Sequence, residues 1–259
     1  MLLAIDIGNS TIKAGFFEKE KPIAHFALGS DPDKTADEYA FFLGSLSKKE
    51  HLQKIDGAII GSVVPSLTKT IKEALKKLCD VPVLTVGPGL RTGFALKIDN
   101  PSELGADLAA NAAGALKEQG APCLVADFGT VSTLLVVDEQ GAYRGGCFFP
   151  GVGMSLDALG GAKLLPDIPA ETALSALGTN TADCMRAGVI RGQAFSLAGF
   201  IKTYKAKLSL PADTPLIVTG GYAPLILPCL PKETVHEPLL TLKGLSAIYE
   251  FNKKGRKNG

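Results

Sequence analysis

Two stretches of the chain place a carboxylate, a glycine and small hydroxylic side chains directly after an apolar run. The first is MLLAIDIGNSTIKAGFF, in which the apolar run is interrupted by Asp6, Gly8, Asn9, Ser10 and Thr11. Gly8 allows a tight turn and a close approach of the backbone to a ligand, and backbone N–H groups in such a turn bind anions. Lys13 adds a positive charge, and Asp6 could hold Mg²⁺ beside a phosphate. The stretch indicates either a hairpin that binds phosphate and magnesium or an ordinary hairpin with an Asx-type turn.

The same plan returns in CLVADFGTVSTLLVVD, where Asp127 comes at the end of an apolar strand and Gly129 and Thr130 follow. Two such hairpins on either side of a cleft would hold a polyphosphate from both sides. Self-similarity at this distance predicts two related lobes rather than a solenoid. We place the boundary where an alanine-rich helix ends in KEQGAP, which gives an N-terminal lobe over 1–116 and a C-terminal lobe over 117–259.

A third glycine-rich site follows the apolar run PLIVT, at Gly220 and Gly221. Two glycines at the end of a strand would allow the backbone to approach a flat ligand such as adenine. A turn from a strand into a helix is the alternative. The sequence contains neither a P-loop motif nor a G-x-G-x-x-G motif after a strand, which argues against the two commonest nucleotide folds.

The elements that must position these residues alternate along the chain. LLAIDIGNSTIKAGFF is typical of strand, turn and strand, and DGAIIGSVV and PVLTV are typical of short buried strands. PSLTKTIKEALKKLC has helical spacing, a proline near its start and lysines near its end. This alternation predicts an α/β fold with a partly parallel sheet.

Composition excludes several classes of protein. The 259 residues are 46% hydrophobic and 20% charged, as in an ordinary globular chain. A formal net charge of +1 gives no reason to expect binding to nucleic acid or to a membrane surface. The five cysteines include no C-x-x-C pair and the three histidines are far apart, so we expect reduced thiols and no structural zinc. Without a basic segment before an apolar one, or a run of about 20 apolar residues, the expected location is the cytoplasm.

The two hairpins and the later Thr-Gly-Gly resemble the ATP-binding lobes of actin, the heat-shock chaperone ATPases and the sugar and acetate kinases. Within that superfamily, nearly the whole chain resembles the type III pantothenate kinases. The matching stretches, in order, are DIGNSTIK, GSVVPSL, VGPGLRTG, NPSELGADLAAN, DFGTVST, YRGGCFFPGVGMSLDAL, LGTNT, TGG and LTLKGLSAIYEFN. The resemblance implies two related lobes of mixed β-sheet flanked by helices, the duplicated ribonuclease H-like fold of actin-like ATPases. It also implies phosphorylation of pantothenate by ATP to 4'-phosphopantothenate, the first step of coenzyme A biosynthesis.

The resemblance further implies roles for individual residues. Asp107, in GADL, matches the catalytic carboxylate, Asp127 matches a monovalent-cation site for K⁺ or NH₄⁺, and Asp6 would hold Mg²⁺. The implied ATP-binding residues are Asp6, Ile7, Gly8, Asn9, Ser10, Thr11, Ile12, Lys13, Thr130, Gly220 and Gly221. The implied substrate-binding residues are Gly105, Ala106, Asp107, Leu108 and Thr181. Family members are homodimers with the substrate pocket completed at the subunit interface, and Gly145 to Gly151 either shape that region or form a plain turn.

Two positions depart from the family pattern on the side of the acceptor. The family commonly has arginine after the catalytic aspartate, where this chain has Leu108, and tyrosine where this chain has Ile98. Leucine cannot form a bidentate pair with a carboxylate. Arg91, in GLRTGF, could replace the missing cation. Otherwise the chain is a catalytically silent ATP-binding paralogue, or a kinase for another small hydroxylated acceptor.

Overall fold

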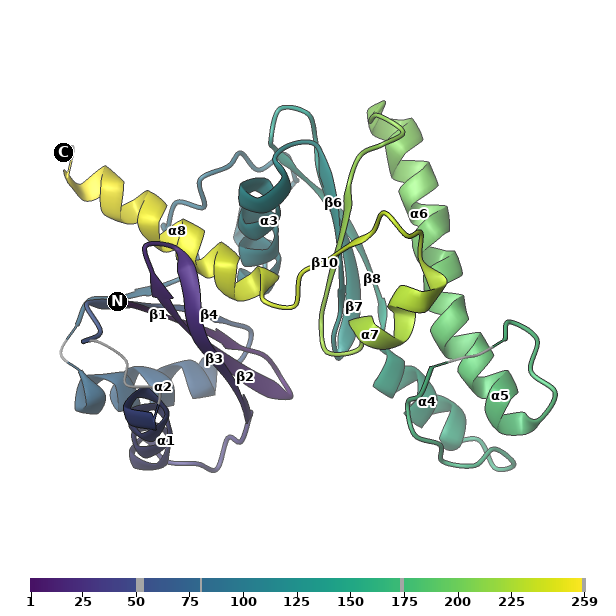
Figure 1. Cartoon of the computed structure of the whole chain (residues 1–259), viewed down its shortest axis with the longest axis horizontal. Coiled ribbons are helices and arrows are strands. Elements are labelled where there is room, and N and C mark those ends of the chain that lie inside the picture. The colour runs from purple at the N-terminus through teal and green to yellow at the C-terminus, as the bar shows by residue number, and fades with distance from the viewer. Residues whose placement is uncertain (50–53, 80, 173–174, 258–259) are drawn as a thin grey trace. The chain divides into compact units, whose positions relative to one another are not determined.

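The computed structural model describes residues 1–49, 54–79, 81–172 and 175–257 of the chain (Figure 1). These residues form two compact units, each with a five-stranded mixed sheet. The first unit comprises Met1–Ala95, Asp99–Lys117 and Leu240–Gly259, and the second comprises Leu96–Ile98 and Glu118–Leu239. The lobes expected from the sequence, 1–116 and 117–259, assign residues 96–98, 117 and 240–259 differently.

The first unit contains a sheet of strand order β3-β2-β1-β4-β5. Its strands are β1 (Leu2–Ile7), β2 (Thr11–Glu18), β3 (Lys21–Gly29), β4 (Gly57–Ser62) and β5 (Val83–Thr85). Its helices are α1 (Ala36–Lys49), α2 (Pro65–Leu78), α3 (Ala106–Gln119) and α8 (Leu240–Lys257), with a 3₁₀ turn at Pro101–Glu103. β1 pairs antiparallel with β2 and parallel with β4.

The second unit repeats this arrangement, with strand order β10-β9-β6-β7-β8. Its strands are β6 (Cys123–Phe128), β7 (Val131–Val137), β8 (Tyr143–Pro150), β9 (Leu216–Thr219) and β10 (Val235–His236). Its helices are α4 (Val152–Gly160), α5 (Thr181–Arg186), α6 (Gly192–Leu208) and α7 (Ala223–Ile226), with a 3₁₀ turn at Leu227–Cys229. β6 corresponds to β1, since it pairs antiparallel with β7 and parallel with β9. The duplication predicted from the two hairpin sequences is confirmed by this shared strand order.

The two faces of the first sheet are packed differently. On one face, alternate apolar residues of β1 lie in a core with side chains of α1 and α2, including Tyr39 and Leu67. On the other face, Gly15, Gly57 and Gly61 make room for Leu242, Tyr249 and Leu245 of α8. A Cβ at Gly15 would lie 3.1 Å from Leu242, and one at Gly61 would lie 2.9 Å from Leu245. α8 therefore belongs to the first unit, although it lies at the far end of the sequence.

α3 and α8 cross at two further glycines. A Cβ at Gly244 would lie 1.7 Å from the backbone oxygen of Ala110, and one at Gly114 would lie 2.6 Å from the backbone oxygen of Leu240. Beside this crossing, the buried Thr241 hydroxyl donates to Asn111 Oδ1 over 2.8 Å. The helices pack backbone to backbone, which only residues without a side chain permit.

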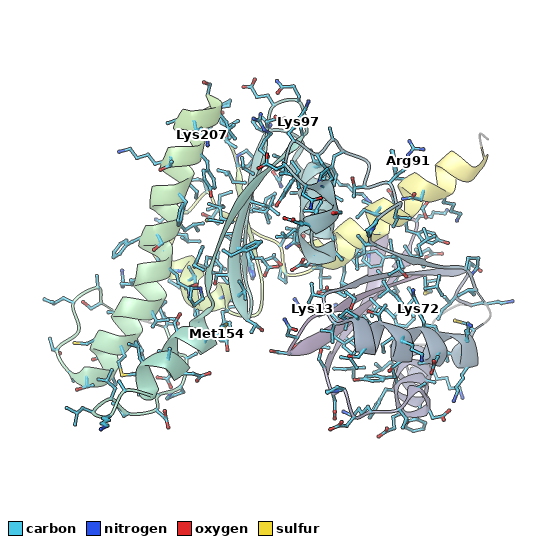
Figure 2. The ribbon with its side chains drawn as sticks, turned by 180° about the vertical axis from the view of Figure 1, so that it is seen from behind. Lys13, Lys72, Arg91, Lys97, Met154 and Lys207 are labelled. Carbon is cyan, nitrogen blue, oxygen red and sulfur yellow. The ribbon has the colours of Figure 1, made fainter. Side chains whose placement is uncertain are left out.

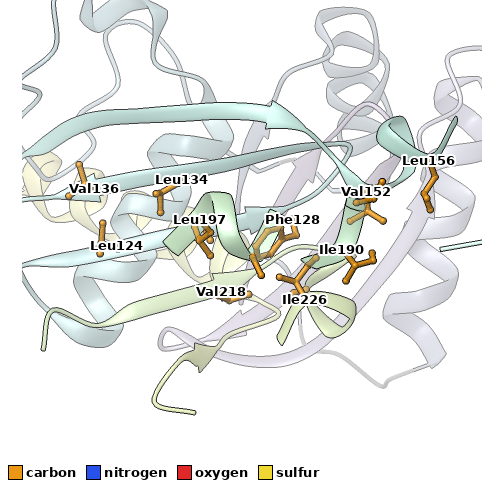
Figure 3. Close-up of a cluster of buried hydrophobic side chains, with 14 of the residues drawn as sticks. Leu124, Phe128, Leu134, Val136, Val152, Leu156, Ile190, Leu197, Val218 and Ile226 are labelled. Atoms are coloured by element: carbon orange, nitrogen blue, oxygen red, sulfur yellow. The ribbon is translucent and has the colours of Figure 1, made fainter. Parts of the chain in front are cut away.

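The second unit has its own core, drawn in Figure 3. Phe128, Val218, Ile190 and Leu197 are buried together in it, so one face of the sheet packs against the helical segment that ends with α6. That segment is a continuous helical run in which a π-turn, Ala187–Arg191, separates α5 from α6. π-turns are rare in helices and occur often at functional sites.

Candidate active site

The first candidate element is the turn between β1 and β2. Asp6, at the end of β1, lies opposite Lys13 on β2 and beside Gly61 on β4. The N–H of Gly8 donates to the Thr11 carbonyl over 3.0 Å and closes the turn. Figure 2 shows Lys13 near this end of the first sheet. The structure thus brings the carboxylate, the lysine and the glycine turn to one end of one hairpin.

Ser30 fixes this turn from a neighbouring strand end. Its hydroxyl donates to the Gly8 carbonyl over 2.5 Å, and its N–H donates to the Ser10 carbonyl over 3.1 Å. The buried Tyr39 hydroxyl in turn donates to the Asp31 carbonyl over 2.9 Å. The loop that follows β3 is therefore tied to α1 on one side and to the turn on the other. The sequence does not signal this role of Ser30, because the contact spans 22 residues and no local pattern marks it.

Asp107 lies in the first turn of α3, whose start packs against the strand next to Asp6. A Cβ at Gly61 would lie 3.7 Å from Ala106 Cβ, so the residue before Asp107 is a neighbour of the strand position that pairs with Asp6. Asp107 is half-buried, and its Oδ1 accepts from the Leu108 N–H over 2.9 Å. A carboxylate in this position is favoured by the helix N-terminus and keeps one oxygen for another partner.

Asn100 shapes the segment before α3. The Asn100 side chain accepts from the Ser102 N–H over 3.2 Å and donates to Glu103 over 2.8 Å. Asn100 caps the 3₁₀ turn that leads into the G-A-D segment. Glu103 is exposed and hydrogen-bonded in this cap, so its role in the structure is local.

The second candidate element is the turn between β6 and β7. Asp127 lies opposite Thr133 on β7 and beside Thr219 on β9, the positions that Lys13 and Gly61 occupy around Asp6. The hydroxyls of both threonines are buried and have no hydrogen-bond partner among the described residues. One carboxylate with two neutral hydroxyls is an oxygen donor set of low charge, which suits a weakly held cation.

Two glycines press against the turn of this second hairpin. A Cβ at Gly151 would lie 2.3 Å from the carbonyl oxygens of Gly129 and Thr130, and the Gly151 N–H donates to the Thr130 carbonyl over 3.1 Å. Gly220, with φ of +100°, has the Phe128 backbone 2.5 Å from its Cβ position. A Cβ at Gly221, in contrast, would meet nothing within 4 Å. Gly220 is therefore a packing residue, whereas Gly221 leaves open space beside the hairpin.

The other residues expected on the acceptor side, Thr181, Leu108 and Ile98, have fewer contacts with the two hairpins. Thr181 is the exposed first residue of α5, whose cap is Asn180. Among the described residues, no hydrogen bond or ion pair joins Thr181 to the second hairpin. Leu108 is 7% exposed and packs in the interior. Ile98 lies beside Gly145, whose Cβ position is 3.7 Å from it.

Arg91, the sequence-based candidate for the missing cation, is held by an aromatic ring. Its guanidinium lies 4.9 Å from the ring centroid of Phe251 on α8, and its carbonyl accepts from Asn252 over 2.7 Å. Figure 2 shows Arg91 beside α8. The cation–π contact gives Arg91 a role within the first unit that is independent of any ligand.

Two general properties of the described residues bear on function. Within them, no three histidine, cysteine, aspartate or glutamate side chains come together as metal ligands. A metal would therefore need oxygens from the backbone, from hydroxyls or from its own substrate. No helix among the described residues is long and apolar enough to cross a membrane.

Comparison with solved structures defines the class of fold. The chain has a TM-score of 0.64 to a Campylobacter jejuni protein of the Baf family, at 18% identity over 97% of this chain and 99% of that one. It has a TM-score of 0.52 to a ROK family glucokinase from Streptomyces griseus, at 13% identity over 98% and 99%. With its two related mixed sheets, the chain has the duplicated fold of actin-like ATPases and kinases.

Comparison of sequences defines the family within that class. The family model for type III pantothenate kinase matches residues 2–203. The chain is 38% identical to the type III pantothenate kinase of Moorella thermoacetica over 97% of this chain and 100% of that protein. Against the corresponding protein of Listeria monocytogenes it is 35% identical, over 98% of each chain. The chain belongs to the type III pantothenate kinase family and is a kinase.

Proposed function

We propose that this chain transfers the γ-phosphoryl group of ATP to the primary hydroxyl of pantothenate, which gives 4'-phosphopantothenate, the first intermediate of coenzyme A biosynthesis. The observation that carries the proposal is the position of Asp107. It lies half-buried in the first turn of α3, and that turn packs against Gly61, the strand partner of Asp6. A proton acceptor thus lies one strand away from the hairpin proposed to hold the phosphates.

The first unit supplies the phosphate site and the base in this proposal. The turn from Asp6 to Thr11 presents backbone N–H groups to the triphosphate, and Lys13 adds positive charge. Mg²⁺, held through Asp6 and the phosphates, would neutralise charge on the transferring group. Asp107 orients the attacking hydroxyl and accepts its proton. The neighbouring Gly105, Ala106 and Leu108 shape the acceptor side.

The second unit supplies the remaining ATP contacts and the cation. Thr130 contacts the nucleotide, and the open space at Gly221 next to the packed Gly220 admits the adenosine. Asp127 holds K⁺ or NH₄⁺, and the buried Thr133 and Thr219 hydroxyls fit as further oxygen ligands. Thr181 contacts pantothenate.

The direct test is release of ADP from purified protein with Mg-ATP and K⁺, with and without pantothenate. We expect stimulation by pantothenate, and formation of 4'-phosphopantothenate in equal amount. Binding of ATP without stimulation by any small hydroxylated compound would mean that the chain is a silent paralogue. Stronger stimulation by another hydroxy acid or alcohol would reassign the acceptor.

A different acceptor is a candidate because of one observation. Leu108 is a buried, uncharged side chain, and the guanidinium of Arg91 lies over the ring of Phe251. Neither residue therefore offers a free cation for the carboxylate of pantothenate. Loss of such a charge-assisted contact costs about 1.5–3 kcal/mol. If the acceptor is different, the KM for pantothenate should exceed that for a small hydroxylated compound without a carboxylate, and steady-state kinetics with both acceptors measures the difference.

Dependence on a monovalent cation is a further prediction from the second hairpin. Replacement of K⁺ by Na⁺ should lower turnover, because the proposed oxygen ligands come from three paired strands and cannot move inward around a smaller ion. Thr219→Val, which removes one hydroxyl without a change of volume, should raise the K⁺ concentration for half-maximal activity. Val131→Thr, at an exposed position of the same hairpin, is the control. Equal rates in K⁺ and Na⁺ would remove the cation from the proposal.

We also propose that the protein is a cytoplasmic homodimer whose partner subunit completes the substrate pocket. The second unit exposes Phe148 on edge strand β8 and Phe195 and Phe200 on α6, at 66%, 64% and 38%. Exposed aromatic residues are typical of interfaces. Light scattering should give twice the chain mass of 27.0 kDa, and the mass of a single chain would rule out this part of the proposal.

A further inference from the structure

Gln193 is a buried amide that joins three elements of the second unit. It is the second residue of α6, directly after the π-turn, and it is 6% exposed. Its Oε1 accepts from the Ser132 hydroxyl over 2.8 Å, and its Nε2 donates to the Pro150 carbonyl over 3.1 Å. The amide oxygen is therefore hydrogen-bonded to β7, and the amide nitrogen is hydrogen-bonded to β8.

The π-turn determines which residue of α6 faces β7 and β8. One extra residue in a helical turn rotates the helix that follows by about 100°. Ile190, Ala194 and Leu197, at helical spacing through and after the π-turn, are buried in the core. Figure 3 shows Ile190 and Leu197 in the same cluster as Phe128. Gln193 lies on this buried side of the helix and makes two hydrogen bonds there, whereas its buried neighbours make apolar contacts.

The two partners of Gln193 lie on β7 and β8, close to where β7 leaves the second hairpin turn. Ser132 follows Val131 on β7, and Val131 is paired with Pro150 on β8. The next residue, Gly151, donates to the Thr130 carbonyl and has no space for a side chain. The Gln193 side chain therefore adds two hydrogen bonds to the β7–β8 ladder at the residues nearest the turn, and it ties that end of the ladder to α6.

We propose that Gln193 is a positioning residue that holds the Gly129–Thr130 turn in the geometry needed for ATP. The inference rests on the proposed function, because it takes Thr130 to be an ATP contact. Ser132 acts through Gln193: its hydroxyl is fully buried and donates to the amide, so it is not available to a ligand. Loss of either partner leaves the other buried without a hydrogen bond.

The test compares Gln193→Met, Ser132→Ala and the double variant by titration with ATP and by steady-state kinetics. Gln193→Met keeps the volume but cannot accept from Ser132 or donate to Pro150. We expect its Kd and KM for ATP to rise about tenfold, while kcat at saturating ATP changes less than about threefold. The double variant should bind ATP no more weakly than Gln193→Met, since the two side chains act as one unit. Ser196→Ala, at an exposed position of α6, should leave both constants unchanged.

Unchanged ATP affinity in Gln193→Met and Ser132→Ala, even with a lower melting temperature, would show a purely structural role and overturn the inference. Additive losses in the double variant would overturn the coupling through Ser132. If Gln193→Met fails to fold, Ser132→Ala alone must still weaken ATP binding. A wild-type chain that binds ATP without phosphorylating pantothenate would overturn only the proposed acceptor, because the titration needs no acceptor.

Discussion

Replacement of Asp107 by asparagine should lower kcat by about 10²- to 10⁴-fold and leave ATP binding within about twofold of wild type. The amide oxygen can still accept from the Leu108 N–H, which the Asp107 carboxylate does over 2.9 Å. The start of α3 should therefore keep its structure. The amide cannot accept the proton of the attacking hydroxyl, so the loss should be in turnover. Steady-state kinetics with saturating pantothenate and a separate ATP titration measure the two quantities.

The matched control for Asp107→Asn is Glu103→Gln. Glu103 is an exposed carboxylate four residues earlier, and it accepts from Asn100 in the preceding cap. Its amide should keep that bond and near-normal turnover. A variant at Asp107 with the wild-type rate would show that another group accepts the proton, and equal losses at both positions would indicate a general effect of charge.

Replacement of Gly244 by alanine should destabilise the first unit by about 3 kcal/mol or more. The new Cβ would lie 1.7 Å from the Ala110 backbone oxygen, and no flexible side chain is available to move away. α8 must therefore shift away from α3 or from the glycines of the sheet. For a chain of this size, the expected fall in melting temperature is about 6–12 °C. Thermal unfolding followed by circular dichroism measures it.

Gly199→Ala is the control for the Gly244 variant. Gly199 is also in a helix, α6, but a Cβ there would meet nothing within 4 Å. Alanine should raise stability by up to about 1 kcal/mol, since it restricts the unfolded chain. If both variants had the same melting temperature, the close crossing of α3 and α8 would not exist in solution.

The sequence predicted those parts of the site that are local in the chain. An apolar run followed by a carboxylate and a glycine predicts a strand and a turn, and Asp6 and Asp127 are indeed the second-last residues of β1 and β6. Repetition of the pattern predicted the duplicated fold. The roles of these residues, and that of Asp107, stay predictions that the experiments above test.

The contacts that hold these turns could not be predicted, because their partners are distant in sequence. Ser30 supports the first turn and Gln193 the second, across 22 and 61 residues. The sequence allows Gly145 to Gly151 to shape an interface or to form a plain turn, and it does not signal that Gly151 packs directly on the Gly129 and Thr130 carbonyls. The spacing of apolar residues predicts which face of a helix or strand is buried, but it does not predict which other element packs on that face.

The return of the chain to its first unit determines the order in which the protein can fold during synthesis. The first unit is left at Lys117 and completed only by α8, from Leu240 onward. Domains generally fold from the N-terminus as the ribosome releases them. Here residues 118–239 are released before α8, so the second unit can reach its final structure while the glycine face of the first sheet still lacks α8. The first unit contains the N-terminus, and yet it can be completed only after the whole second unit has been synthesised.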